Sequence, residues 1–107
     1  MNAWYAFDAG RTIGTLGSED GVILLDDEHG DGARITIERG GKIAPFSITC
    51  GVYGAMFHTR FFATEDEAQR ECTEMKAALA TLLDEVANAA DIQETGRIIA
   101  QFVERFP

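Results

Sequence analysis

Apolar and polar residues alternate over much of residues 3–62, the period-two pattern of strands that bury one face. Residues 33–38 show it most clearly, with Arg34, Thr36 and Glu38 on one side and alanine and isoleucine on the other. Residues 22–25 are instead four successive apolar residues, which indicates burial on both faces. Between glycine-containing turns, the pattern predicts about six strands, at residues 3–8, 11–16, 21–25, 33–38, 46–50 and 55–62.

The last two of these segments predict a hairpin. A four-residue loop over residues 51–54 would pair Cys50 with Ala55 and Ser47 with His58. In that register the apolar residues of both strands share one face of the sheet. The opposite face is then predicted to carry a polar set: Ser47, Thr49, His58 and Arg60.

Beyond residue 63 the apolar spacing changes to alternating steps of four and three, the stripe of an amphipathic helix. Thr64 and Glu67 have the spacing of a capping box, which predicts a helix over about 65–87. A second cap at Asp91 predicts another helix over about 92–105. The wide apolar face of this last helix holds Ile92, Ile98, Ile99, Phe102, Val103 and Phe106.

Glycine usage follows the same division, since ten of the eleven glycines lie at or before Gly54. We therefore expect one α+β domain over residues 1–107. It comprises an antiparallel β-meander of about six strands (residues 3–62) and two C-terminal helices packed on one face. The apolar residues at 22–25 and on the last helix exceed what one layer of helices covers, so either the sheet curls on itself or a second copy covers them; we predict a homodimer.

Charge and composition narrow the classes of partner. Nine Lys+Arg against 18 Asp+Glu give 9 − 18 = −9, which argues against a nucleic-acid partner because phosphate binding needs clustered basic residues. No stretch reaches ~20 apolar residues, so no membrane span is expected. The absence of a signal-like N-terminal pattern and the two free cysteines favour a cytoplasmic location. No motif calls for a cofactor.

The acidic residues gather in two places. Residues 18–32 contain six acids and no Lys or Arg, and residues 65–74 contain five acids against Arg70. One interpretation is solubility together with favourable charge at a helix N-terminus. The other is a surface that steers a basic protein partner.

A second hypothesis is a divalent ion or small ligand bound by the acidic loop 26–32. Residues 27–38 resemble the calcium loop of EF-hand proteins, with Asp27, Asp31 and Glu38 at ligand positions and a turn glycine at position six. The segment departs from that pattern at His29, and its flanks are predicted strands rather than helices. The candidate ligands are Asp27, His29 and Asp31; the alternative is an acidic hairpin turn.

An enzyme is the third hypothesis. The predicted register places Ser47 opposite His58, with Thr49 and Arg60 beside them, but no carboxylate is placed to orient the histidine. The same register puts Cys50 and His58 on opposite faces, which excludes a dyad between them. A solvated strand face is the alternative for this polar set.

Aromatic residues suggest an interface. The first strand places Trp4 and Tyr5 on opposite faces, so one aromatic set could be exposed as an interface; the alternative is core packing at the edge of the sheet. Together with the apolar last helix, this makes Trp4, Tyr5, Phe102 and Phe106 the candidate interface. The function expected first is therefore non-enzymatic protein–protein contact, with self-association or a basic protein partner.

Overall fold

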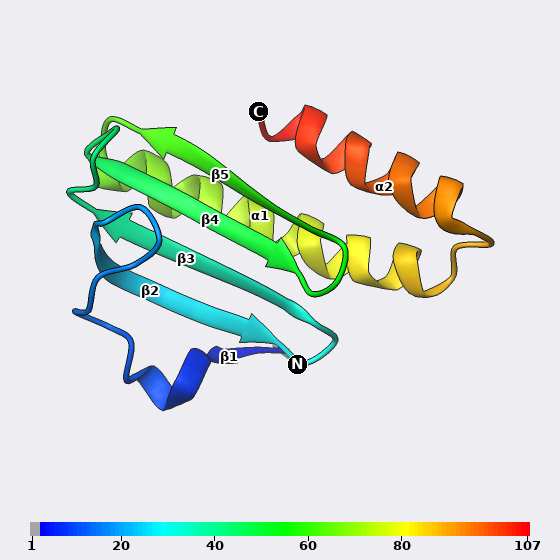
Figure 1. Ribbon diagram of the computed structural model, residues 1–107, viewed down its shortest axis with the longest axis horizontal. Helices are drawn as coiled ribbons and strands as arrows, with labels where there is room; N and C mark the ends of the chain where they lie inside the picture. The colour runs from blue at the N-terminus through cyan, green and yellow to red at the C-terminus, as the bar shows by residue number, and fades with distance from the viewer. Residues whose placement is uncertain (1–2) are drawn as a thin grey trace.

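The computed structural model describes residues 3–107 as one antiparallel sheet covered on one side by two helices (Figure 1). The sheet has the order β1-β2-β3-β4-β5, a simple meander. Its strands are β1 (Trp4–Ala6), β2 (Val22–His29), β3 (Ala33–Arg39), β4 (Phe46–Val52) and β5 (Met56–Phe62). A short 3-10 turn, η1 (Phe7–Gly10), follows β1, and the helices are α1 (Glu65–Ala87) and α2 (Ile92–Arg105). The α+β class and the meander are thus confirmed.

The sheet has five strands rather than about six because residues 11–16 do not form a strand. Turn bonds organise this segment instead: Ile13 N–H donates to Gly10 O, and Thr15 N–H to Thr12 O. Gly10 and Gly14 adopt positive φ, which interrupts an extended chain. Leu16 makes only an isolated bridge with Val22.

A bulge in β2 explains the four successive apolar residues. Ile23 lies opposite Glu38 and Leu25 opposite Ile37, so Leu24 is an extra residue in the ladder. Leu24 and Leu25 both pack against the core beneath the helices, while Ile23 points to the other side of the sheet. A single chain therefore covers these residues, and they do not require a second copy.

The predicted register of the β4–β5 hairpin was wrong. Val52 pairs with Met56 across a three-residue turn, so Cys50 lies opposite His58 instead of Ala55. Gly54 in this turn has φ +77°, the left-handed conformation that short hairpin loops require. The partner of Cys50 moves by three residues, an odd number, and every side chain of β5 changes face.

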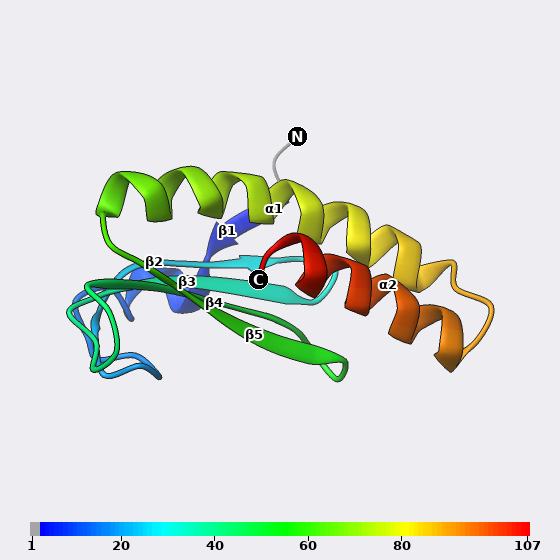
Figure 2. The same cartoon turned by 90° about the horizontal axis from the view of Figure 1, so that it is seen from above.

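The two faces of the sheet are consequently distinct. The helix face carries the apolar residues of β3 and β4, and α1 lies across it, with α2 beside α1 (Figure 2). The open face, which no helix covers, carries side chains at alternate positions: Asp26, Glu28, Arg34, Thr36, Glu38, Ser47, Thr49, Phe57, Thr59 and Phe61.

Both helices have the predicted bounds. Thr64 accepts a hydrogen bond from Glu67 N–H, and Asp91 accepts one from Glu94 N–H. The inward stripe of α1 is buried against β3, β4 and β5. Within residues 3–107, no helix combines the length and the apolar composition of a membrane span.

Replacing Leu79 by alanine tests this core. Leu79 is fully buried in the centre of α1, so Leu79→Ala should lower the free energy of unfolding by about 2–5 kcal/mol. Urea titration measures the change. Ile92→Ala, at a residue 89% exposed, is the matched control and should change stability by less than about 0.5 kcal/mol. Equal losses in the two variants would contradict the assignment of the core.

Candidate binding site on the open face

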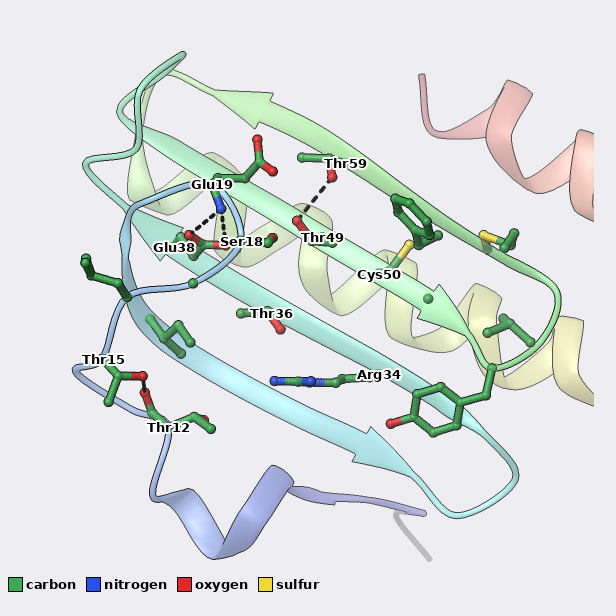
Figure 3. Close-up of a pocket in the computed structure, with 18 of the residues that line it drawn as sticks. Thr12, Thr15, Ser18, Glu19, Arg34, Thr36, Glu38, Thr49, Cys50 and Thr59 are labelled. Carbon is green, nitrogen blue, oxygen red and sulfur yellow. Dashed lines mark hydrogen bonds between the residues drawn. The ribbon is translucent and has the colours of Figure 1, made fainter.

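The open face holds a hollow of about 990 Å³ (Figure 3). Its floor is formed by β3 and β4. One wall is the segment 12–19, and the other is formed by the 53–56 turn with the start of β5. Ligand pockets in proteins typically enclose about 300–1,000 Å³, so this hollow is large and open.

A row of polar side chains crosses the floor. The sheet register aligns Asp26 with Thr36, Thr36 with Thr49, and Thr49 with Thr59, so four strands contribute one residue each. The hydroxyls of Thr49 and Thr59 are hydrogen-bonded at 3.2 Å. Cross-strand threonine pairs stabilise a sheet and still leave hydroxyl oxygens free to accept further bonds.

Asp26 ends this row in a tight cluster. Its carboxylate accepts two hydrogen bonds from Arg34, at 2.8 and 2.7 Å, and one from the Thr12 hydroxyl at 2.8 Å. Burial alone would raise the pKa of Asp26, but the hydrogen bonds from Arg34 and Thr12 and the charge of Arg34 outweigh it and lower the pKa. The pair neutralises Arg34 and ties Thr12 to the sheet.

Glu38 holds the other end of the same segment. It is 1% exposed, and its Oε1 accepts from Glu19 N–H at 3.1 Å and from Gly21 N–H at 3.0 Å. No basic side chain forms a salt bridge with it within residues 3–107. A Cβ on Gly17 would lie 2.4 Å from Glu38 Cδ, so a larger residue there would displace the Glu38 carboxyl group. Ser47 lies opposite Glu38, and its buried hydroxyl has no hydrogen-bond partner in this part of the chain.

Aromatic and apolar side chains surround the hollow. Tyr53 and Tyr5 both donate hydrogen bonds to Glu28, and burial together with Glu28 raises the pKa of Tyr53 to about 12. Phe57 is 83% exposed and Phe61 42% exposed, both on the open face of β5. Leu16 is exposed on the opposite wall. Exposed large apolar residues gathered on one face are typical of an interaction surface.

The predicted polar set is split between the two faces. Ser47 and Thr49 lie on the open face, whereas His58 and Arg60 lie on the helix face because of the register correction. His58 Nε2 is 2.6 Å from Phe106 O, and Arg60 donates to Glu71 at 2.8 Å and to Pro107 O at 3.2 Å. These two residues therefore fasten the C-terminal end of the chain to β5.

Cys50 and His58 lie opposite each other on the helix face, contrary to the sequence-based expectation. Cys50 is almost fully buried, and this burial raises the pKa of its thiol to about 12. A thiol with such a pKa stays protonated at neutral pH, so the pair lacks the thiolate that nucleophilic catalysis requires.

The candidate metal ligands are engaged elsewhere. Residues 26–29 belong to β2 rather than to a loop, which sends Asp27 and His29 to the helix face. Asp27 pairs with Lys76 of α1, and His29 Nδ1 accepts from Asp31 N–H at 3.0 Å. Within residues 3–107, no group of three or more His, Cys, Asp or Glu side chains is placed to hold a metal ion.

Of the predicted interface residues, only Tyr5 is exposed, and it lies beside the hollow. Trp4 packs against the core and against the His29 ring at 5.1 Å, while Phe102 and Phe106 are buried within the chain. The aromatic residues that do mark the open face, Tyr53, Phe57 and Phe61, were not singled out. A three-residue loop at 53–55 would have predicted this arrangement, because its register places Phe57 and Phe61 on the same face of the sheet as Thr49 and Thr59.

Removing the charge of Asp26 tests its hydrogen bonds with Arg34 and Thr12. Asp26→Asn should lower the free energy of unfolding by about 1–3 kcal/mol at about pH 7, because Arg34 loses its charged acceptor. The lowered pKa means that this stabilisation is complete above the ordinary pKa of aspartate and is lost as pH falls through the folded-state pKa. Urea titrations should therefore show the gap between wild type and variant begin to close only below about pH 4 and disappear as pH falls through the lowered pKa of Asp26. Asp31→Asn, at an exposed carboxylate, is the control and should behave like wild type. A stability gap that persists in acid would contradict the assignment.

The buried thiols give a second test. Burial raises the pKa of Cys50 to about 12 and that of Cys72 to about 11, so neither should react with a thiol-specific disulfide reagent at about pH 8 in the folded protein. Both should react once the chain is unfolded in denaturant. Ser18→Cys places a thiol at an exposed position of the hollow and should react at once. Rapid labelling of Cys50 in the native protein would show a reactive thiol that this geometry does not allow.

The sequence matches no protein-family model, and no curated protein and no solved structure is significantly similar to it. The function must therefore be argued from the site.

Proposed function

We propose that this protein is a non-enzymatic binding domain whose open sheet face contacts a basic protein partner. The observation that carries the proposal is the group of exposed apolar and aromatic side chains on the open face, with Leu16 on one wall of the hollow and Tyr53 and Phe57 on the other. Within residues 3–107 no other segment covers Phe57, Phe61 or Leu16. Protein interfaces place such residues around their centre, where they contribute most of the binding energy.

Charge favours a basic partner. The chain carries −9, and the basic residues near the open face are already engaged: Arg34 with Asp26, and Lys42 with Asp20. Glu19 lines the hollow without a salt bridge among the described residues, and Glu28 lies beside it. A complementary positive surface would be attracted to this face and oriented on it.

The same charge argues against a second copy as the occupant. Pairing two open faces would bring together two chains of −9 each, and like charges across an interface are unfavourable. Self-association stays a prediction. The cytoplasmic location, which the charge does not bear on, also stays a prediction. A catalytic role has less support, because the threonine hydroxyls of the hollow bond to one another or to Asp26, whose carboxylate is already paired with Arg34.

Truncating Phe57 tests the proposal. Immobilised wild-type protein should retain a basic protein from native lysate at low salt and lose it at high salt. With that protein purified, calorimetry should show Phe57→Ser weakening the affinity at least about tenfold, the loss expected at an interface hot spot. Ile92→Ser removes an equally exposed apolar side chain from the start of α2 and should leave the affinity unchanged.

Two results would contradict the proposal. One is an affinity that Phe57→Ser and Ile92→Ser alter equally. The other is a dimer in light scattering that Phe57→Ser dissociates, since the open face would then serve self-association.

A further inference from the structure

We propose that the hollow receives a segment of the partner in which an arginine or lysine is flanked by apolar residues. The cationic group enters between Glu19 and the threonine row, and its apolar neighbours rest on Tyr53, Phe57 and Leu16. This inference rests on the proposed function and names the chemistry of what binds there.

The balance of charge around the hollow is the first support. Arg34 is the one basic residue that lines it, and both carboxylate oxygens of Asp26 already accept hydrogen bonds from its guanidinium. Glu19 and Glu38 line the hollow and Glu28 adjoins it through Tyr53, none of them in a salt bridge within the described chain. A low-dielectric concavity with excess negative charge concentrates cations.

The placement of Glu19 makes it the direct partner. Its backbone N–H is held by Glu38 at 3.1 Å, which fixes the position of the residue while leaving its own carboxylate free to bind. Figure 3 shows this side chain extending from the loop toward the Thr59 side of the hollow. An ammonium or guanidinium group in the hollow would thus meet a carboxylate whose backbone is already ordered, which limits the entropy lost on binding.

The floor and rim complete the recognition of such a group. Thr36, Thr49 and Thr59 present hydroxyl oxygens in one row, and the several N–H donors of a guanidinium need several acceptors at once. The rings of Tyr53 and Phe57 line the same hollow, and aromatic rings attract cations to their faces. Threonine hydroxyls alone would accept hydrogen bonds from any polar group. Threonine hydroxyls combined with aromatic rings favour a cation.

The size and edges of the hollow indicate a protein segment rather than a small free cation. A space of about 990 Å³ exceeds one side chain, and exposed Leu16 and Phe57 flank it on opposite walls. Apolar residues on either side of the cation would bury Leu16 and Phe57 from water, which favours binding. The bound segment must therefore carry a cationic side chain and apolar residues on either side of it.

A random peptide library tests the inference without knowledge of the partner. Peptides of about twelve residues, which span roughly 40 Å when extended, would be selected on the immobilised full-length protein. We expect the enriched sequences to share an arginine or lysine between apolar residues. In synthetic versions of these peptides, replacing that residue by glutamine should weaken binding at least about tenfold. Glu19→Gln in the protein should weaken the cationic peptide several-fold and leave the glutamine peptide unaffected. Glu104→Gln makes the same charge change at an exposed position of α2 and should alter neither affinity.

The outcomes separate this inference from the proposed function. Peptides that lose binding in Phe57→Ser but show no cation preference and no response to Glu19→Gln would overturn the inference and leave the open face as the binding surface. Peptides that bind Phe57→Ser as well as wild type would overturn both. Failure to enrich any peptide would overturn the inference alone, since a folded partner surface could still bind the open face.

Discussion

The open face depends on two buried carboxyl groups that hold one irregular segment against the sheet. Asp26 fastens Thr12, and Glu38 accepts from the backbone of Glu19 and Gly21. The ring of Phe7 lies under the Arg34 guanidinium at 3.6 Å and adds a third attachment. Residues 7–21 have little regular structure of their own, so these contacts decide where the segment lies. Without them the hollow would lose a wall and Glu19 its fixed place.

The chain's own core fills the space between the sheet and the helices. The bulge at Leu24 turns two leucines of β2 toward the core, and α1 fills the space above β3 and β4. Ion pairs tie α1 down at both sides of the sheet, to Asp27 through Lys76 and to Arg60 through Glu71. This face of the sheet is therefore covered by the chain's own helices, whereas no helix covers the open face. This difference between the two faces follows from a single layer of helices on one side of a sheet.

Sequence reasoning predicted the helices to the residue and the sheet only in outline, for a physical reason. Helix bounds follow from local signals, the caps at Thr64 and Asp91 and a stripe that repeats within one turn. Strand register follows from how many residues the turn consumes, and alternation alone accommodated both a four-residue and a three-residue loop. The odd shift moved His58 and Arg60 away from Ser47 and Thr49 and brought Phe57 and Phe61 to the threonines. The contacts of Asp26 and Glu38 could not be predicted either. Both lie at polar positions of a strand, where a carboxylate is expected to face water, and both are buried because residues 12–21 fold over them.

The net charge of −9 becomes informative once paired and unpaired acids are distinguished. Asp26, Asp27 and Glu71 are spent on basic residues of the same chain, so they contribute little to recognition. The three acids in the first turn of α1 are compensated in part by the positive end of that helix, and they act on a partner only through the long-range field. Such charges raise the rate of encounter, whereas a carboxylate inside the contact also slows dissociation. Under the proposed function, Glu19 would lie inside the contact, since its backbone is fixed, its carboxylate is unpaired among the described residues, and it lines the hollow. Specificity for a cationic segment would therefore arise from one residue of the wall, while the remainder of the negative charge brings the partner to it.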